Sequence, residues 1–396
     1  LTQRQLREEK VDEATLRKYL GGMGLGASYL YDEVNPEINW DDPANRLILA
    51  SGPLGGTIVD GTGCFSITTK GPITNGAGCS QANGFFGAFL KFSGFDAVVV
   101  QGQSSDWTYL YLHDGVAELR DARRLVGKDT WETDDLIKEE IGKTARQASV
   151  CCIGPAGENR VKFAAIVSDK GHVAGHNGMG AVMGAKKLKA IAVARGKPRF
   201  AVKDRERLAA LAKEVFAWRI QDPEVGKKWF EWGTTWIYGS APALGQLPVK
   251  NLTTSVFPEA EKFTGAYCRP RWKIKPNPCW ACRNHHCYLV EVTEGPYAGF
   301  KGEEGDYEVM AAFGSLIGQT DAGAATMLAN ECDKLGLEGI EAGWLISWLI
   351  ECYERGLITR EQADGLPMNW GNVEAVKTML GKISHREGFG DFLAEG

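Results

Sequence analysis

The sequence lacks long apolar runs, basic blocks and dense cysteine. No stretch of about 18 consecutive apolar residues occurs, so the sequence predicts no membrane-spanning helix. The formal net charge is −5 and there is no block of Lys and Arg, which argues against nucleic acid as a partner. Ten cysteines in 396 residues are too few for a disulfide scaffold and favour a reducing, cytoplasmic location. The first residues form no apolar signal region, and the lack of an initiating Met is consistent with a missing natural N-terminus.

Nucleotide-binding motifs are also missing, although glycine is abundant. Residues 22–27 match a loose G-x-G-x-x-A pattern but follow a predicted helix rather than a strand, which argues against a dinucleotide site. Residues 178–186 lack the Gly-Lys-Ser/Thr of a P-loop, so no nucleoside triphosphate site is expected. Residues 51–102 hold 12 of the 49 glycines, which suits either tight turns or a ligand lying against bare backbone. Turns are the default interpretation.

The order of the predicted elements indicates two parts. Asp114-Gly115 between two alternating segments predicts a β-hairpin over 109–112 and 116–119. Further strands are predicted at 47–49, 64–69, 97–100, 149–153, 163–167 and 189–193, and one helix at 130–141. Beyond Asp204 the apolar periodicity predicts mainly helices, near 205–218, 321–335, 343–355 and 373–384. The expected fold class is therefore α+β, with a β-rich domain over residues 1–198 and a mostly helical domain over 199–396.

Three cysteines, Cys279, Cys282 and Cys287, lie within nine residues. Clustered thiolates suit a soft metal centre, because sulfur donates charge to iron or zinc better than oxygen does. The spacing alone leaves three alternatives open. They are an iron–sulfur cluster with a fourth ligand from elsewhere, a zinc site completed by His285 or His286, and unligated thiols.

Two acidic residues have both a structural and a functional interpretation. In the segment from Asp333 to Leu337, Gly336 suits a left-handed helix cap, whereas Asp333 could accept N–H groups of a bound heterocycle. Glu308 precedes an apolar helical segment over 309–317. It is either a solvated first-turn acid favoured by the helix dipole or a buried carboxylate whose raised pKa suits proton transfer.

Taken in order along the chain, many short stretches resemble the tungsten-dependent aldehyde ferredoxin oxidoreductase family. The resemblance covers essentially the whole chain and begins at residues 18–25. It continues through residues 52–54, 69–72, 84–91, 153–159, 180–184, 248–251, 333–337 and 386–391. So many matches in family order are more specific than any single motif.

The resemblance implies a β-rich saddle for a tungsten bis-pyranopterin (tungstopterin), covered by a helical domain. The residues that would line the pterin are Gln81, Asn83, Gly84, His176, Asn177 and Gly178 from the β-rich side, and Asp333 and Leu337 from the helical side. Cys279, Cys282 and Cys287 would hold a [4Fe-4S] cluster. Glu308 would transfer protons in carbonyl chemistry, while the metal centre carries the two-electron step.

The function implied is oxidation of aldehydes to carboxylic acids, or the reverse. Electrons would pass through the cluster to ferredoxin or to an iron–sulfur electron-transfer subunit. One alternative is the catalytic subunit of a tungsten-dependent aromatic acyl-CoA reductase, which a related branch suggests. The alternative outside enzymes is a cofactor-free metal-binding electron-transfer module, which would bind iron or zinc but no tungsten. A magnesium ion and a homo-oligomer are also compatible with the resemblance.

The chain departs from the family pattern at several positions. One residue is inserted between the second and third Cys of the usual Cys-x₂-Cys-x₃-Cys motif. Cys64 and His176 stand where family members often carry Arg. Met327 replaces a Glu that ligates an intersubunit metal in some members, so we expect no such metal here. The family's fourth cluster Cys and its catalytic His lie beyond residue 396, so we expect residues 1–396 to be a fragment.

Overall fold

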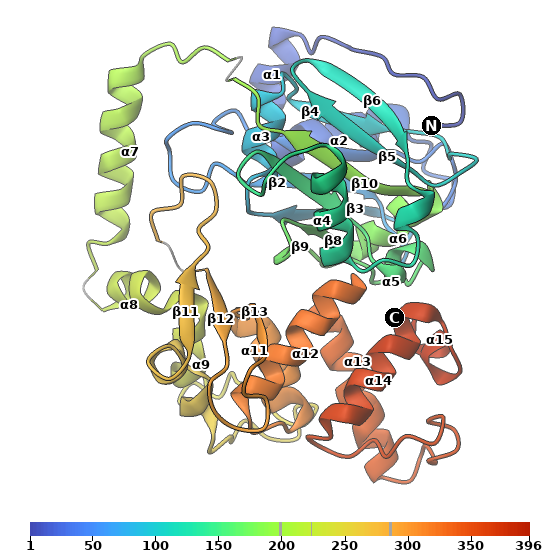
Figure 1. The fold of residues 1–396 in the computed structure, drawn as a ribbon, viewed down its shortest axis with the longest axis vertical. Helices are drawn as coiled ribbons and strands as arrows, with labels where there is room; N and C mark the ends of the chain where they lie inside the picture. The colour runs from blue at the N-terminus through green and yellow to red at the C-terminus, as the bar shows by residue number, and fades with distance from the viewer. Residues whose placement is uncertain (198–199, 223, 285–286) are drawn as a thin grey trace.

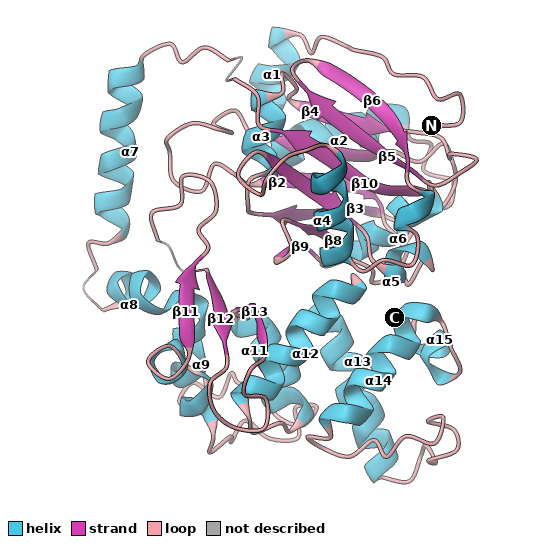
Figure 2. Ribbon diagram, viewed as in Figure 1, coloured by secondary structure: helices cyan, strands magenta, loops and turns pink. Residues whose placement is uncertain are grey.

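The structure is a computed structural model, and it describes residues 1–197, 200–222, 224–284 and 287–396. Figures 1 and 2 show a part rich in strands above a mainly helical part, with the long helix α7 (Arg205–Arg219) standing beside them. The predicted α+β fold class is confirmed. The domain boundary predicted at residues 198–199 lies outside the described residues and stays a prediction.

The first sheet is antiparallel and follows the strand order β3-β2-β1-β4. Its strands are β1 (Leu47–Ser51), β2 (Phe65–Lys70), β3 (Ala77–Ala82) and β4 (Ala97–Val100). Every position of β1 and β2 is buried, because α2 (Gly22–Glu33) and α6 (Met179–Ala185) pack against these strands. The helices α1 (Glu13–Tyr19) and α3 (Phe86–Phe92) complete this region. Strand β3 was not predicted, because its small residues give no clear apolar alternation.

The glycine-rich stretch 22–27 lies inside α2 rather than at a strand-to-helix turn. A Cβ on Gly26 would lie 2.4 Å from Oγ1 of Thr68, which is far closer than real side chains approach. Gly26 therefore allows α2 to pack directly on β2, whereas a Cβ on Gly24 would lie 2.3 Å from the carbonyl oxygen of Tyr19 in α1.

The second sheet follows the order β6-β5-β10-β7-β8-β9, and only its β5–β10 pair is parallel among the described residues. The predicted hairpin is confirmed, with Asp114 and Gly115 both at positive φ, 47° and 81°. The strands are β5 (Thr108–His113), β6 (Val116–Asp121), β7 (Ala148–Cys152), β8 (Ile166–Ser168), β9 (His172–Ala174) and β10 (Leu188–Ala194). The helices around this sheet are α4 (Thr130–Glu140), α5 (Pro155–Glu158) and the 3₁₀ turns η1 (Arg123–Leu125) and η2 (His176–Gly178).

The strand predicted over 163–167 is only partly present, because β8 begins at Ile166. The preceding backbone pairs with the helical part instead. Ala165 N donates to Gly336 O at 2.8 Å, and Glu338 N donates to Phe163 O at 3.0 Å. The apolar run therefore marks a contact between the two parts of the chain rather than a longer strand.

Beyond residue 204 the predicted predominance of helices is confirmed, with a small unpredicted sheet of order β11-β12-β13. The strands are β11 (Lys273–Pro276), β12 (Tyr288–Glu291) and β13 (Lys301–Glu303). The helices after α7 are α8 (Val225–Trp232), α9 (Ile237–Ser240), α10 (Gly265–Cys268), α11 (Tyr307–Phe313), α12 (Ala322–Leu335), α13 (Gly339–Glu354), α14 (Val373–His385) and α15 (Phe389–Leu393). Their core also contains Val161 and Phe163, so the two parts share one hydrophobic cluster.

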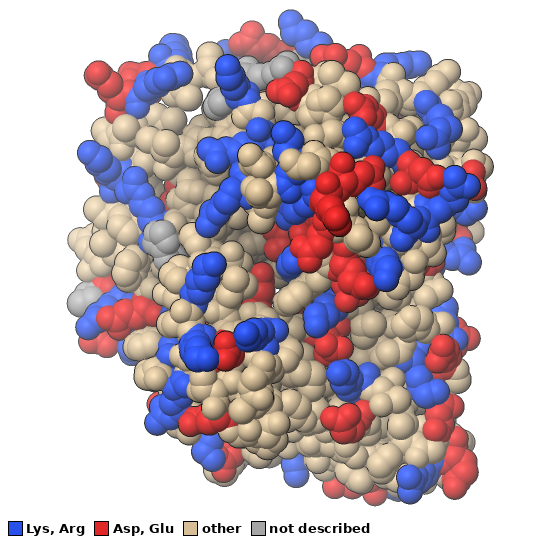
Figure 3. All heavy atoms as spheres, in the orientation of Figure 1, with Lys and Arg blue, Asp and Glu red and all other residues tan. Residues whose placement is uncertain are grey.

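On the face shown in Figure 3, basic and acidic side chains occur in small mixed groups. Among the described residues, every helix is either too short or too polar to cross a membrane.

Candidate cofactor site

The three cysteines of the motif lie in the loop between β11 and β12, here called the Cys loop (277–287, without 285–286). Figure 1 shows this loop extending from the small sheet toward the β-rich part. Asn277 N donates to Cys287 O at 2.8 Å, and Cys282 N donates to Cys279 O at 3.2 Å. The first bond joins the two ends of the loop, and the second closes a turn between the first two cysteines.

The Cys loop is fastened to the β-rich part by backbone and side-chain hydrogen bonds. Trp280 N donates to Gly84 O at 3.0 Å, and Trp280 Nε1 donates to Thr57 O at 3.0 Å. Arg283 N donates to Asp60 Oδ1 at 2.9 Å. Because these contacts join segments more than 190 residues apart, no local sequence signal predicts them. Sequence reasoning did not identify Trp280 as a site residue, although it lies inside the motif itself.

One of the three thiols, Cys279, is favoured in the ionised form that binds metals. The interaction with the Cys287 thiol, and then that with His172, lowers the pKa of Cys279, while the interaction with Cys279 raises the pKa of Cys287. Because the thiolate is the form that binds iron or zinc, the Cys loop fits a thiolate-ligated centre.

Metal ligation itself stays a prediction. Within the described ranges, no group of three or more His, Cys, Asp or Glu side chains is arranged to hold a single metal ion. The zinc alternative depends on His285 or His286, which lie outside the described residues. All ten cysteines are described, and each is a free thiol.

A polar cluster, here called the buried polar cluster, lies beneath the Cys loop and is formed by the buried His172 and the half-buried Asp169, Cys279 and Glu303. His172 is 8% exposed, and its Nε2 lies 3.7 Å from Cys279 Sγ. Burial alone would lower the pKa of His172, but the hydrogen bond to Cys279 and the surrounding negative charges raise it to about 9. Burial raises the pKa of Glu303 to about 7, and the nearby thiolate and Asp169 add to that effect. Sequence reasoning did not identify His172, because a lone His in a short strand carries no motif.

Gly84, a predicted pterin residue, is the point at which this cluster meets the Cys loop. It has φ +92°, and a Cβ there would lie 2.7 Å from Cδ2 of His172 and 2.9 Å from Oδ2 of Asp169. Its carbonyl oxygen is the one that accepts the hydrogen bond from Trp280. Any larger residue would therefore separate these groups.

The other residues predicted on the β-rich side come together on neighbouring segments. Gln81 on β3 and Asn83 just after it are exposed, as are His176 and Asn177 of η2. Asn177 Nδ2 donates to Cys79 O at 3.0 Å, which holds η2 against β3. Exposed amide groups can donate and accept hydrogen bonds to a polar heterocycle such as a pterin, so these residues fit that ligand. The remaining predicted member, Gly178, is buried at φ +65°. Cys64, named above as a departure from the family pattern, has its Sγ 3.8 Å from Gln81 Oε1.

On the helical side, Asp333 and Leu337 lie at the end of α12. Gly336 ends this helix at φ +74°, and the buried Leu337 follows it, as the structural interpretation expected. The turn contacts the backbone of residues 163–165, so it lies against the β-rich part. Burial, together with the nearby Glu303, raises the pKa of Asp333 well above its ordinary range. A carboxyl group that holds its proton can donate as well as accept a hydrogen bond, which suits a pterin ring.

Glu308 lies in the first turn of α11, where Asp306 caps the helix by accepting from Val309 N at 3.1 Å. It is exposed, although partial burial and then the negative charge of Asp306 raise its pKa. The negative charge of Asp306 contributes to the raised pKa of both Glu308 and Asp333, so the two carboxyl groups face a common charge. The catalytic role of Glu308 stays a prediction.

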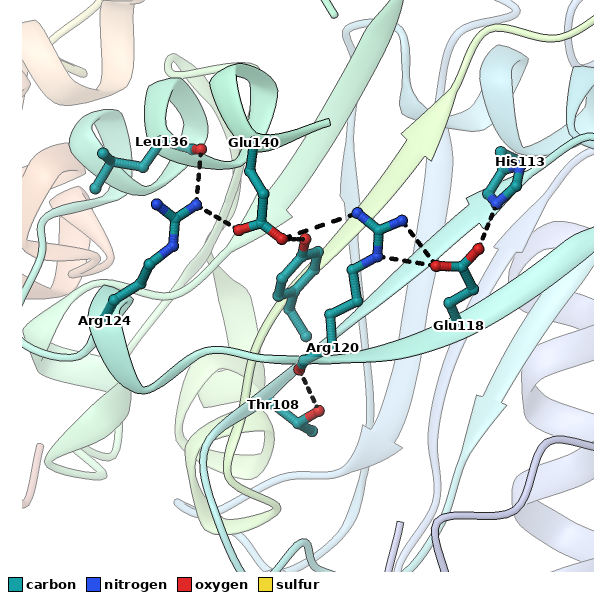
Figure 4. A network of polar contacts seen from close by, with 8 residues as sticks. Thr108, His113, Glu118, Arg120, Arg124, Leu136 and Glu140 are labelled. Carbon is teal, nitrogen blue, oxygen red and sulfur yellow. Dashed lines mark hydrogen bonds and ion pairs between the residues drawn. The ribbon is translucent and has the colours of Figure 1, made fainter. Parts of the chain in front are cut away.

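A separate surface concavity of about 590 Å³ contains none of the predicted site residues. It adjoins the group shown in Figure 4, here called the edge network, in which Glu140 and Glu118 bind Arg120, Arg124 and His113. Its charges are already paired with one another, so the concavity offers no obvious ligand chemistry.

Comparison with known proteins identifies the family. One family model, described as the N-terminal domain of aldehyde ferredoxin oxidoreductase, matches residues 1–195, and another, described as domains 2 and 3, matches residues 210–396. The chain is 37% identical over 397 residues to the tungsten-containing aldehyde ferredoxin oxidoreductase of Pyrococcus furiosus, and 37% identical over 398 residues to that of Thermococcus kodakarensis. The alignments cover 99% of this chain but 64% of each relative. The chain belongs to the aldehyde ferredoxin oxidoreductase family.

The chain is also similar to two proteins whose names describe other substrates. A protein named aliphatic sulfonate oxidoreductase, WOR-like subunit, from Pyrococcus furiosus is 30% identical over 415 residues, covering all of this chain and 65% of its own length. A solved structure described as the active-site complex BamBC of benzoyl coenzyme A reductase with 1,5-dienoyl-CoA superimposes with a TM-score of 0.87. That chain is 28% identical, and the match covers all of this chain and 60% of the other.

Proposed function

We propose that this chain forms the cofactor-binding part of a tungstopterin oxidoreductase that oxidises aldehydes to carboxylic acids, or catalyses the reverse. The observation that carries the proposal is the clamped Cys loop, with its stabilised Cys279 thiolate, in a chain of this family. Electrons would leave through a [4Fe-4S] cluster held by Cys279, Cys282 and Cys287 to ferredoxin or to an iron–sulfur subunit.

Each predicted residue then has a defined task. The pterin would be held by Gln81, Asn83, Gly84, His176, Asn177 and Gly178 on one side and by Asp333 and Leu337 on the other. When bound, tungstopterin would supply the two-electron chemistry at the carbonyl carbon. Asp333 would keep its proton and donate it as a hydrogen bond, because burial disfavours its charged form. Glu308 would accept or return a proton during turnover, since its raised pKa brings it nearer to neutral pH.

The second candidate is a tungsten-dependent aromatic acyl-CoA reductase subunit. The structural similarity to the benzoyl coenzyme A reductase complex over the whole chain favours it. The higher identity to aldehyde ferredoxin oxidoreductases favours the first candidate. We further propose a division into residues 1–198 and 199–396, and a reducing cytoplasmic location in keeping with the free thiols.

Anaerobic purification followed by metal analysis and viologen-coupled assays tests the main proposal. We expect tungsten, iron and a fluorescent pterin after acid release, and dye reduction with aldehydes but not with aromatic acyl-CoA products. Iron or zinc without tungsten, molybdenum or pterin would instead support the electron-transfer module. Dye reduction with the acyl-CoA compound alone would support the second candidate.

The role of Glu308 is tested by Glu308→Gln in the same assay. We expect this variant to retain its cofactors and to lose turnover on the order of 10²-fold or more. Glu374→Gln is the matched control, because Glu374 is also an exposed acid in the first turn of a helix. A near-normal rate for Glu308→Gln would remove Glu308 from the mechanism.

A further inference from the structure

His172 joins the two parts of the chain directly at the thiol motif. It lies on β9, at the edge of the second sheet, whereas Cys279 belongs to the Cys loop of the other part. The 3.7 Å separation between His172 Nε2 and Cys279 Sγ is within hydrogen-bond distance for sulfur. With 8% of its surface exposed, His172 has little access to water as a competing partner.

The chemistry of a ligating thiolate decides which atom of this contact carries the proton. A cysteine sulfur that ligates iron is a thiolate and has no proton to donate. At the 3.7 Å contact the proton must therefore lie on the ring nitrogen of His172. Asp169 is itself fixed, because its Oδ2 accepts from Phe85 N at 3.0 Å and from Ser149 Oγ at 2.8 Å. His172 is therefore the donor and the Cys279 sulfur the acceptor.

Glycine positions keep this arrangement compact. A Cβ on Gly171 would lie 1.7 Å from Glu303 Oε2, so Glu303 reaches the side of His172 only because its neighbour is glycine. Glu303 also accepts a hydrogen bond from Asn277 Nδ2 at 3.2 Å, which ties the carboxyl group to the base of the Cys loop. The ring of His172 is thus enclosed by groups that the Cys loop itself helps to hold.

We infer that His172 is a positioning residue that tunes the cluster proposed above, by donating a hydrogen bond from Nε2 to the ligating sulfur of Cys279. Hydrogen bonds to cluster sulfur atoms withdraw electron density and stabilise the reduced state, so they raise the reduction potential. This inference rests on the proposed function, because it requires that Cys279 bind an iron–sulfur cluster. It assigns a role to a residue outside the thiol motif.

A purely structural role for His172 predicts a different experimental result from a tuning role. Trp280 and Arg283 already clamp the Cys loop through three hydrogen bonds that do not involve His172. Removal of the imidazole should therefore leave the loop in place and change the electronic environment of one sulfur. A tuning residue shifts the potential at constant iron content, whereas a structural residue changes the iron content.

The experiment is an EPR-monitored redox titration of the cluster in the anaerobically purified holoenzyme. His172→Leu removes the donor, and His172→Gln supplies an amide N–H in its place. His385→Leu is the control, because His385 is exposed on α14 and forms hydrogen bonds to Ser384 and Gly381 of that helix. We expect unchanged iron content in all variants, a lower midpoint potential for His172→Leu, partial recovery for His172→Gln and no shift for His385→Leu.

The possible outcomes separate this inference from the proposed function. A fully loaded His172→Leu protein with the wild-type potential would overturn the inference and leave the proposed cluster intact. Loss of iron from both His172 variants would also overturn it, since His172 would then be structural. A wild-type protein that binds no cluster would reject the cluster assignment and the inference together.

Discussion

Two histidines of this chain each contact an acceptor through Nε2, and they lie in opposite surroundings. His113, in the edge network, lies 2.8 Å from Glu118 Oε1, with 26% and 37% of the two side chains exposed. His172 contacts the Cys279 sulfur and is 8% exposed. Water can replace a lost partner in the edge network but has little access to the buried polar cluster.

The comparison shows how burial changes the contribution of the same kind of contact to the stability of the fold. An exposed ion pair contributes about 0–1 kcal/mol, because water and salt screen both charges. In the buried polar cluster the low local dielectric strengthens every contact and makes an unpaired charge expensive. The edge network should therefore tolerate substitution, whereas the region around His172 should not.

The largest expected effect on the free energy of unfolding follows from removing the lysine next to the buried polar cluster. Lys138 Nζ lies 2.7 Å from Asp134 Oδ1 and 3.9 Å from Asp169 Oδ1, and all three side chains are nearly inaccessible. Lys138→Met leaves two buried carboxylates without their cation and should reduce the free energy of unfolding by about 3–5 kcal/mol.

Urea denaturation measures this loss, and Lys128→Met provides the control. Lys128 pairs with Glu132 at the same i,i+4 spacing, but both side chains are more than 40% exposed. Its loss should change stability by about 0.5 kcal/mol or less. Equal effects of the two substitutions would show that burial does not set the strength of these pairs.

A second large effect is expected at Trp280, which fastens the Cys loop. Its ring packs edge-on against Phe92 at 5.0 Å between centroids and donates a hydrogen bond to Thr57 O. Trp280→Ala should cost about 2–3 kcal/mol, below the range for a fully buried Trp, and should lower iron content after anaerobic reconstitution. Trp218→Ala, on the 74% exposed Trp218 of α7, should leave both properties unchanged. Normal iron loading in Trp280→Ala would mean that the loop needs no clamp.

A smaller, pH-dependent effect is expected from Asp134. Burial raises its pKa from the usual 3.8 to about 6, so the folded state binds this proton more tightly than the unfolded state does. Its contribution to stability should therefore fall as the pH rises from about 4 to about 6, by on the order of 1–3 kcal/mol, and then stay constant. Asp134→Asn should flatten this part of the curve in urea denaturation between pH 4 and pH 7. An unchanged slope would assign the pH dependence to other carboxyl groups.

The smallest effect is expected in the edge network itself. Arg124 binds Glu140 and the Leu136 carbonyl oxygen, and its side chain is 51% exposed. Arg124→Ala should reduce stability by less than about 1 kcal/mol at low salt, and the difference should vanish near 1 M salt. Thermal denaturation at two salt concentrations measures it, and a loss that persists in high salt would place Arg124 in a less solvated setting than its exposure indicates.

Features that depend on a few neighbouring residues could be predicted from the sequence. Asp114-Gly115 specified the hairpin because both residues tolerate positive φ, and Gly336 specified the end of α12 for the same reason. Helix α2 was not predicted, because Gly22, Gly24 and Gly26 are poor helix formers, and Gly24 and Gly26 are explained only by close packing on α1 and β2.

The candidate site could be predicted only in its motif and its family resemblance. The thiols of Cys279, Cys282 and Cys287 are visible in nine residues, but the groups that set their chemistry come from distant segments. His172 is more than 100 residues away, and Trp280 is informative only once Gly84 is known to lie against it. Contacts of this range are decided by tertiary packing, which no local pattern encodes.

The position of β10 has a consequence for synthesis on the ribosome. This strand lies between β5 and β7 in the middle of the second sheet, yet it is the last strand of that sheet to be translated. At about 5–20 residues per second, β5 emerges several seconds before its parallel partner exists. During that interval the nascent chain presents an incomplete apolar sheet with an open edge. Cotranslational chaperone binding is therefore expected to matter most just before Leu188–Ala194 leaves the exit tunnel.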